Sequence, residues 1–174
     1  PFGVNGLVFL SGLAMAITPG KAGELLKSYL LRDRAGVPVP ASAPVVVMER
    51  LTDVVSVALL ALLGLALLPV PVLGVLAVAL VLCGAAILLI VTRKADRLFR
   101  LPVLRRWNNA LRTSHEGLRQ LAAPRVMVAG LVLGTAAWFS EGLALWVILQ
   151  GLDAQVSLLR ALPIYAAATL VGAV

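Results

Sequence analysis

Residues 72–91 read VLGVLAVALVLCGAAILLIV and contain no charged side chain. A helix of about 20 apolar residues is long enough to cross the hydrocarbon core of a bilayer. The stretch therefore predicts a membrane-spanning helix. It also holds Cys83, the only cysteine of the sequence, among Leu, Val and Ala. We expect Cys83 to be a small buried hydrophobic residue, and a lone cysteine cannot form a disulfide or a thiolate metal site within this chain.

The remainder of the sequence shares this apolar character. The 174 residues are 61% hydrophobic and 13% charged, with a mean hydropathy of +1.02, whereas soluble domains are about half apolar and about a quarter charged. We therefore expect an all-α, polytopic helical membrane protein of the plasma (inner) membrane, with a single helical membrane domain over residues 1–174. Since there is no initiator Met and the last residues stop inside an apolar run, both ends are expected to be truncations.

Turn residues divide the sequence into about five hydrophobic segments. The first is expected to break at Pro19-Gly20, because proline cannot continue the helical hydrogen bonding and glycine permits a turn. Residues 21–34 then form an amphipathic interfacial or re-entrant helix with Ser28 on its polar face, and residues 36–40 end it. The predicted spans are residues 2–17, 41–68, 72–91, 126–149 and 158–174.

The formal net charge of +7 comes mostly from one segment. Nine of the fifteen Lys and Arg lie in the loop of residues 92–125, whereas the turns at 69–71 and 151–157 hold none. The positive-inside rule places this basic loop in the cytoplasm and the two turns outside. At the membrane surface the loop is expected to bind anionic lipid headgroups rather than nucleic acid. His115, the only histidine, is expected to be an ordinary exposed side chain of this loop.

Charged residues also occur where lipid is expected to surround the chain. Glu49, Arg50 and Asp53 fall in the middle of the 41–68 segment, and helical spacing puts the two acids on one face with Arg50 at its edge. A charge at the bilayer centre costs about 2.5 to 3.5 kcal/mol on insertion scales, so such residues normally face the protein interior or a cavity. They form either a structural ion pair that fixes helix packing, or a functional site whose second acid serves a cationic headgroup, a proton or a lysine.

The 126–149 segment carries two further features. Glu141 is another intramembrane acid, about 5 Å beyond the centre of its span, and it serves either helix packing or a gate or substrate contact. Gly130 and Gly134 form a small-xxx-small pattern, which allows two helices to approach closely. We assign no catalytic residue, no metal site and no cofactor.

Two stretches resemble a known family. They are Pro19-Gly20-Lys21-Ala22-Gly23-Glu24-Leu25-Leu26-Lys27 and Glu49-Arg50-Leu51-Thr52-Asp53. The first is similar to the Pro-Gly-basic-x-Gly-Glu segment, and the second to the Glu-Arg-x-x-Asp segment, of the flippase-like transmembrane family that includes the membrane region of bacterial lysylphosphatidylglycerol synthases. The resemblance covers most of the chain, and a later Pro-Gly-rich segment of the family lies beyond it.

The resemblance implies the movement or handling of phospholipid or polyprenyl-linked (isoprenoid-linked) lipid across the bilayer. We therefore expect a membrane lipid flippase or lipid-transport protein. The alternative is a membrane enzyme of lipid-linked sugar or lipid-headgroup transfer. It is less favoured because metal-dependent sugar transfer would need a cluster of Asp or Glu at an aqueous face, whereas the sequence offers isolated acids there and no soluble transferase domain. These acids are Asp33, Asp96, Glu116 and Asp153. Homo-oligomerisation is left open. The predicted substrate-contacting residues are Lys21, Gly23, Glu24, Glu49, Arg50, Asp53 and Glu141, with Pro19 and Gly20 as the structural break.

Overall fold

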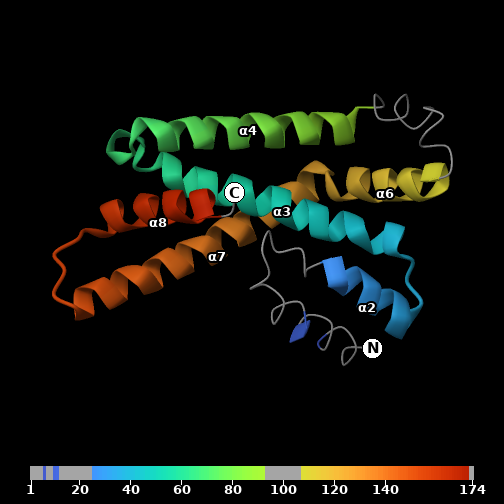
Figure 1. Cartoon of the computed structure of the whole chain (residues 1–174), viewed down its shortest axis with the longest axis horizontal. Helices are drawn as coiled ribbons and strands as arrows, with labels where there is room; N and C mark the ends of the chain where they lie inside the picture. Colours follow the sequence, from blue (N-terminus) through green and yellow to red (C-terminus); the bar gives the residue numbers. More distant parts are fainter. Residues whose placement is uncertain (1–5, 7–9, 12–24, 93–106, 173–174) are drawn as a thin grey trace. The chain divides into compact units, whose positions relative to one another are not determined.

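The computed structural model describes residues 6, 10–11, 25–92 and 107–172. Over these residues the chain is helical and has no β-strand, which confirms the all-α class (Figure 1). The chain divides into two compact units, residues 1–48 with 89–123 and residues 49–88 with 124–174. Of the predicted first span, 2–17, only residues 6 and 10–11 are described, and the Pro19-Gly20 break lies outside the described residues, as does the 93–106 part of the basic loop.

Two of the helices, α4 and α7, are long and apolar enough to cross a membrane, and α8 is a shorter apolar helix. They begin at residues 70, 124 and 158, each within about two residues of a predicted span, because long apolar runs are typical of membrane-spanning helices. The elements of the described part are α2 (Leu25–Ala35), α3 (Val39–Leu62), the 3₁₀ helix η2 (Leu65–Leu67), α4 (Val70–Val91), α6 (Asn108–Leu121), α7 (Pro124–Gly151) and α8 (Leu158–Gly172).

Both α2 and α7 end at a residue in the left-handed conformation. Gly36 has a φ of 68°, and its amide donates to the Arg32 carbonyl at 3.0 Å, as in the simple left-handed helix cap. Asp153 has a φ of 56°, and the following amide, of Ala154, donates to the Leu149 carbonyl at 3.0 Å. The second pattern is a Schellman motif, in which Asp takes the position that glycine usually occupies. Both helices thus stop where the sequence predicts turns.

In the first unit, α6 packs against the N-terminal part of α3 at a proline. Pro44 lies inside α3, and because proline has no N–H, the Pro40 carbonyl loses its usual helical donor. The Ser114 hydroxyl of α6 donates to that carbonyl at 2.9 Å. Gly117, one turn further along α6, leaves room for the proline ring, since a Cβ there would lie 3.0 Å from Pro44 Cγ. The Ser114 hydroxyl and the space at Gly117 together allow α6 to pack against Pro44 of α3.

The substitution Ser114→Ala should lower the free energy of unfolding by about 1 to 2 kcal/mol, because it leaves the Pro40 carbonyl without a donor. Reversible unfolding in detergent micelles measures the difference. Thr113→Ala is the matched control: the Thr113 hydroxyl donates to the Asn109 carbonyl of its own helix at 3.0 Å, and that carbonyl keeps a helical donor. Equal losses for the two variants would contradict the assigned role of Ser114.

The apolar core lies in the second unit. It is formed by α3, α4 and α8, and Trp138 of α7 packs against it. Cys83 is buried, as predicted, at 6% exposed, whereas large apolar side chains on other faces of α4 are exposed, as a lipid-facing helix requires. The core residues are Val57, Ala58, Leu60, Ala61, Leu68, Leu76, Ala166, Ala167 and Leu170.

The C-terminal end of α3 is set by a contact with α8. The helix stops at Leu62, whereas the predicted span continues to Leu68. Gly64 follows, and its backbone lies so close to the Pro163 ring that an added Cβ would collide with the Cγ and Cβ atoms of the ring. The chain turns here and continues as η2. Nothing in the apolar sequence between Leu62 and Leu68 signals a contact with a residue about a hundred positions later.

One prediction of exposure was wrong. His115, expected on the surface, is buried on α6 at 8% exposed, because the amphipathic α6 turns this side of the helix toward protein. Ser28, expected on the polar face of its segment, is 1% exposed, while the neighbouring Tyr29 is 57% exposed. The small serine side chain lets α2 pack closely, whereas the long tyrosine side chain stays on the outside of the helix.

Candidate functional site

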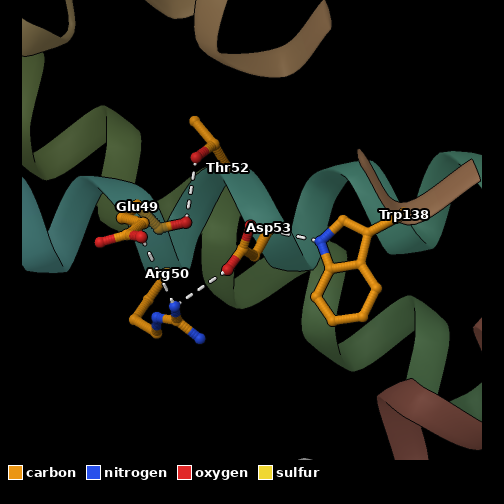
Figure 2. Close-up of polar contacts among 5 residues, drawn as sticks. All are labelled: Glu49, Arg50, Thr52, Asp53 and Trp138. Carbon is orange, nitrogen blue, oxygen red and sulfur yellow. Dashed lines mark hydrogen bonds and ion pairs between the residues drawn. The ribbon is translucent and has the colours of Figure 1, made fainter. Parts of the chain in front are cut away.

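Glu49, Arg50 and Asp53 form a charged turn in the middle of α3 (Figure 2). Thr52 lies beside them, and its hydroxyl donates to the Glu49 backbone carbonyl at 3.0 Å. Such a bond within one helix satisfies the hydroxyl without help from another element. The three charged side chains are therefore the groups of this turn that can reach other elements or a ligand.

Within the charged turn, Arg50 lies closer to Asp53 than to Glu49. Its Nη2 atom is 3.1 Å from Asp53 Oδ2 and 4.0 Å from Glu49 Oε1. The Asp53 side chain is 24% exposed, against 43% for Glu49. Because an ion pair strengthens at short distance and away from water, Arg50 and Asp53 form the main pair, and Glu49 is the outer acid of the turn.

Asp53 has a second partner, which comes from α7. The Trp138 indole N–H donates to Asp53 Oδ1 at 3.2 Å, so that Arg50 and Trp138 contact different oxygens of one carboxylate (Figure 2). A largely buried indole needs an acceptor for its N–H, and this ring packs against the apolar core. Asp53 therefore balances the charge of Arg50 and also ties the charged turn to α7.

The same two helices approach closely along a glycine seam, formed by Gly130 and Gly134 of α7 against Thr52 and Ser56 of α3. A Cβ at Gly134 would lie 2.8 Å from Ser56 Oγ, and one at Gly130 would lie 3.6 Å from Thr52 Cγ2. The small-xxx-small prediction of a close helix contact is thereby confirmed. Both contacts advance by one turn in the same direction along each helix, so α3 and α7 run parallel where they meet.

Glu141 lies one turn beyond Trp138 on α7 and contacts α8. The Tyr165 hydroxyl donates to Glu141 Oε2 at 2.6 Å. The two helices are antiparallel: the Trp146 indole, further along α7, donates to the Val156 carbonyl just before α8, at 3.0 Å. A Cβ at Gly142 would lie 3.2 Å from Tyr165 Cδ1, so the ring packs directly on the α7 backbone.

A shallow apolar groove of about 430 Å³ lies along α3 and α7. Its walls are aliphatic and aromatic apart from one threonine hydroxyl. A groove of this kind, on helices with the composition of membrane spans, offers contacts to a hydrocarbon chain rather than to a polar solute. The lining residues are Leu59, Leu131, Val132, Thr135, Ala136 and Phe139.

The structure brings some of the predicted site residues together and separates others. Glu49, Arg50 and Asp53 share one turn, while Glu141 contacts α8. Trp138 and Tyr165, the hydrogen-bond donors to these acids, were not predicted as site residues, because no local pattern links residues 85 and 24 positions apart. Among the described residues, no group of three His, Cys, Asp or Glu could hold a metal ion. The predicted residues Lys21, Gly23 and Glu24, with Pro19 and Gly20, lie outside the described residues.

Apolar helices that carry an ion pair and a further acid within their length define a polytopic helical membrane protein. The family model described as the lysylphosphatidylglycerol synthase TM region matches residues 1–174, the whole chain, and the chain belongs to this family. The predicted family is thus confirmed, and with it a membrane-embedded function related to lipid. No curated protein and no solved structure matches the chain.

Proposed function

We propose that this protein is a flippase or lipid-transport protein that moves phospholipid or polyprenyl-linked lipid between the leaflets of the plasma membrane. The observation that carries the proposal is the charged turn, in which two acids and one arginine occupy the middle of an otherwise apolar helix. A charge at this depth in the bilayer has a high free-energy cost, so such residues are rare. In transport proteins, ionisable groups at this depth lie where a polar group has to pass.

The side chains of the charged turn have different roles in this proposal. Asp53 is held by Arg50 and Trp138, which makes it the anchor of the site. Glu49 and the outer side of Arg50 are the groups that contact the headgroup, since Glu49 is more exposed and lies 4.0 Å from Arg50. Lys21, Gly23 and Glu24 are proposed to meet the headgroup at the membrane surface, on the basis of the family motif.

The apolar groove supports the lipid nature of the substrate. A headgroup can cross a bilayer at a polar site only if its acyl or isoprenoid chains stay in an apolar environment. The groove lies on α3 and α7, the two helices that Asp53 and Trp138 join. A lipid with its headgroup at the charged turn therefore has an apolar surface for its chains on the same pair of helices.

The orientation of the protein is part of the proposal. The basic loop of residues 92–125 lies in the cytoplasm and binds anionic headgroups there, by the positive-inside rule. The parallel course of α3 and α7 along the glycine seam supports the topology that this orientation requires, in which both helices start on the same side. Two spanning helices that run parallel start on the same side of the membrane. This is the expected result for α3 and α7 when a single span, α4, lies between them in the sequence.

The test is lipid translocation by the protein reconstituted in vesicles, read as exposure of a labelled lipid in the opposite leaflet. Glu49→Gln keeps the shape of the side chain and removes its charge, so we expect the initial rate to fall about tenfold or more, equivalent to about 1.4 kcal/mol. Glu116→Gln, at an exposed acid of α6, is the matched control and should transport normally. A wild-type protein that moves no lipid contradicts the proposal, and recovery of chemically altered lipid supports transfer chemistry instead.

A further inference from the structure

Glu141 differs from the charged turn in its surroundings. α7 has 28 residues, about 42 Å at about 1.5 Å per residue, which exceeds the about 30 Å of the hydrocarbon core. With α7 centred in the bilayer, Glu141 lies about 10 Å inside the nearer boundary. The residue is exposed on the helix surface. At this depth the exposed carboxyl group faces hydrocarbon or another transmembrane surface rather than bulk water.

The carboxyl group of Glu141 has no balancing charge among the described residues. Among residues 25–92 and 107–172, its hydrogen-bond partner is Tyr165, and no Lys or Arg forms an ion pair with it. Asp53 is different, because Arg50 lies 3.1 Å away. An ionised carboxylate without a cation is costly in a low-dielectric medium, and the group is normally neutralised there.

We infer that Glu141 binds and releases a proton during the transport cycle, while Tyr165 holds its carboxyl group against α8. This inference rests on the proposed function and identifies the proton as the ion whose gradient drives lipid movement. A proton from the aqueous phase adds to Oε1 of the Glu141 carboxylate, which becomes a neutral carboxylic acid. The same proton leaves to water when the site next opens to an aqueous phase, and no other bond forms or breaks.

Tyr165 suits this role because a phenol can serve both protonation states. Its hydroxyl donates to an oxygen of the ionised group at 2.6 Å, and the carbonyl oxygen of the protonated acid can accept the same bond. The hydroxyl positions the carboxyl group without supplying a charge. A lysine or arginine in this position would instead keep Glu141 ionised.

The charged groups on neighbouring elements do not neutralise Glu141. α4 carries none, and the charged residue of α8 is Arg160, exposed at the start of that helix. The arginine of the charged turn on α3 pairs with Asp53 and Glu49. On α7 itself the other charged residue is Arg125, near the opposite end of the helix. Of the described residues, Tyr165 is therefore the titratable group that faces Glu141.

The first measurement does not depend on transport. Infrared difference spectra of the protein in lipid bilayers, recorded against pH, should contain a protonated carboxylic acid band that is lost in Glu141→Gln. Tyr165→Phe removes the hydrogen bond to Glu141 Oε2 and should change the frequency of that band. Ser140→Ala is the matched control and should change neither, since the Ser140 hydroxyl donates to the Ala136 carbonyl of its own helix at 2.8 Å. The inference is wrong if every such band persists in Glu141→Gln.

The second measurement separates this inference from the proposed function. In vesicles with an imposed proton gradient, wild-type translocation should fall about tenfold when a proton carrier collapses the gradient. The translocation rate of Glu141→Gln should be the same with the gradient and without it. Lipid movement that is equally fast with and without the gradient overturns the inference and leaves the proposed function standing. If no lipid moves but the Glu141 band still titrates, proton binding is supported and the proposed function fails.

Discussion

Replacement of Arg50 by leucine should lower the free energy of unfolding by about 3 kcal/mol and abolish lipid translocation. Arg50 is the cation of the charged turn, 3.1 Å from Asp53 and 4.0 Å from Glu49. Without it, two acids remain in an otherwise uncharged helix, and removal of one partner of a partly buried ion pair leaves the other charge uncompensated. Reversible unfolding in detergent micelles and labelled-lipid exposure in vesicles measure the two effects.

Asp53→Asn is the informative comparison with Arg50→Leu. The asparagine oxygen can still accept the Trp138 hydrogen bond, and Arg50 keeps Glu49 as a partner. We therefore expect this variant to insert and fold nearly normally but to lose translocation, because the charge of the site changes while its shape does not. Wild-type translocation by a normally folded Asp53→Asn protein would favour a purely structural ion pair. Unchanged stability of Arg50→Leu would contradict the pair itself.

The second large effect is expected at Gly64, where alanine should cost about 2 to 3 kcal/mol of unfolding free energy. An added Cβ would meet the ring of Pro163 in α8. A proline ring is rigid and fully buried here, so that the end of α3 has to move away from α8. Reversible unfolding in detergent micelles measures the loss.

Two other glycines provide controls for Gly64→Ala. Gly84 in α4 has no atom within 4 Å of an added Cβ, so Gly84→Ala should stabilise the helix slightly, by about 0.5 to 1 kcal/mol. At Gly142 an added Cβ would lie 2.7 Å from Leu162 Cδ2, the end of a flexible side chain that can turn aside, and 3.2 Å from Tyr165 Cδ1, which needs to shift by only a few tenths of an ångström. Gly142→Ala should therefore cost less than Gly64→Ala. An equal cost at Gly64 and Gly142 would mean that the rigidity of proline is unimportant.

The sequence predicts the helices well where a long apolar run defines them. α4 and α7 can be predicted from the local sequence, because their length and apolar composition are sufficient for a membrane-spanning helix. The end of α3 could not be predicted in this way. It depends on Gly64 meeting Pro163, and hydrophobic periodicity contains no signal for a contact between distant segments.

The candidate site was predictable to a similar extent. Helical spacing brings Glu49, Arg50 and Asp53 into one turn, and the structure has them there. Helical spacing does not identify the hydrogen-bond donors that α7 and α8 bring to the acids. Trp138 and Tyr165 are also typical of the apolar faces of such helices. The burial of His115 was missed for the same reason: packing against another helix decides it, and charge in the surrounding segment does not.

The prolines inside α3 and α8 limit the motions that these helices can make. Pro44 rests on Gly117 in one unit, and Pro163 rests on Gly64 in the other. If either helix slid along its axis by a residue, the ring would meet a neighbour that carries a side chain, because only glycine leaves this space. Axial sliding is therefore blocked at both contacts, while tilting about them is not. In the second unit, any rearrangement of these helices therefore has to move the end of α3 together with the middle of α8.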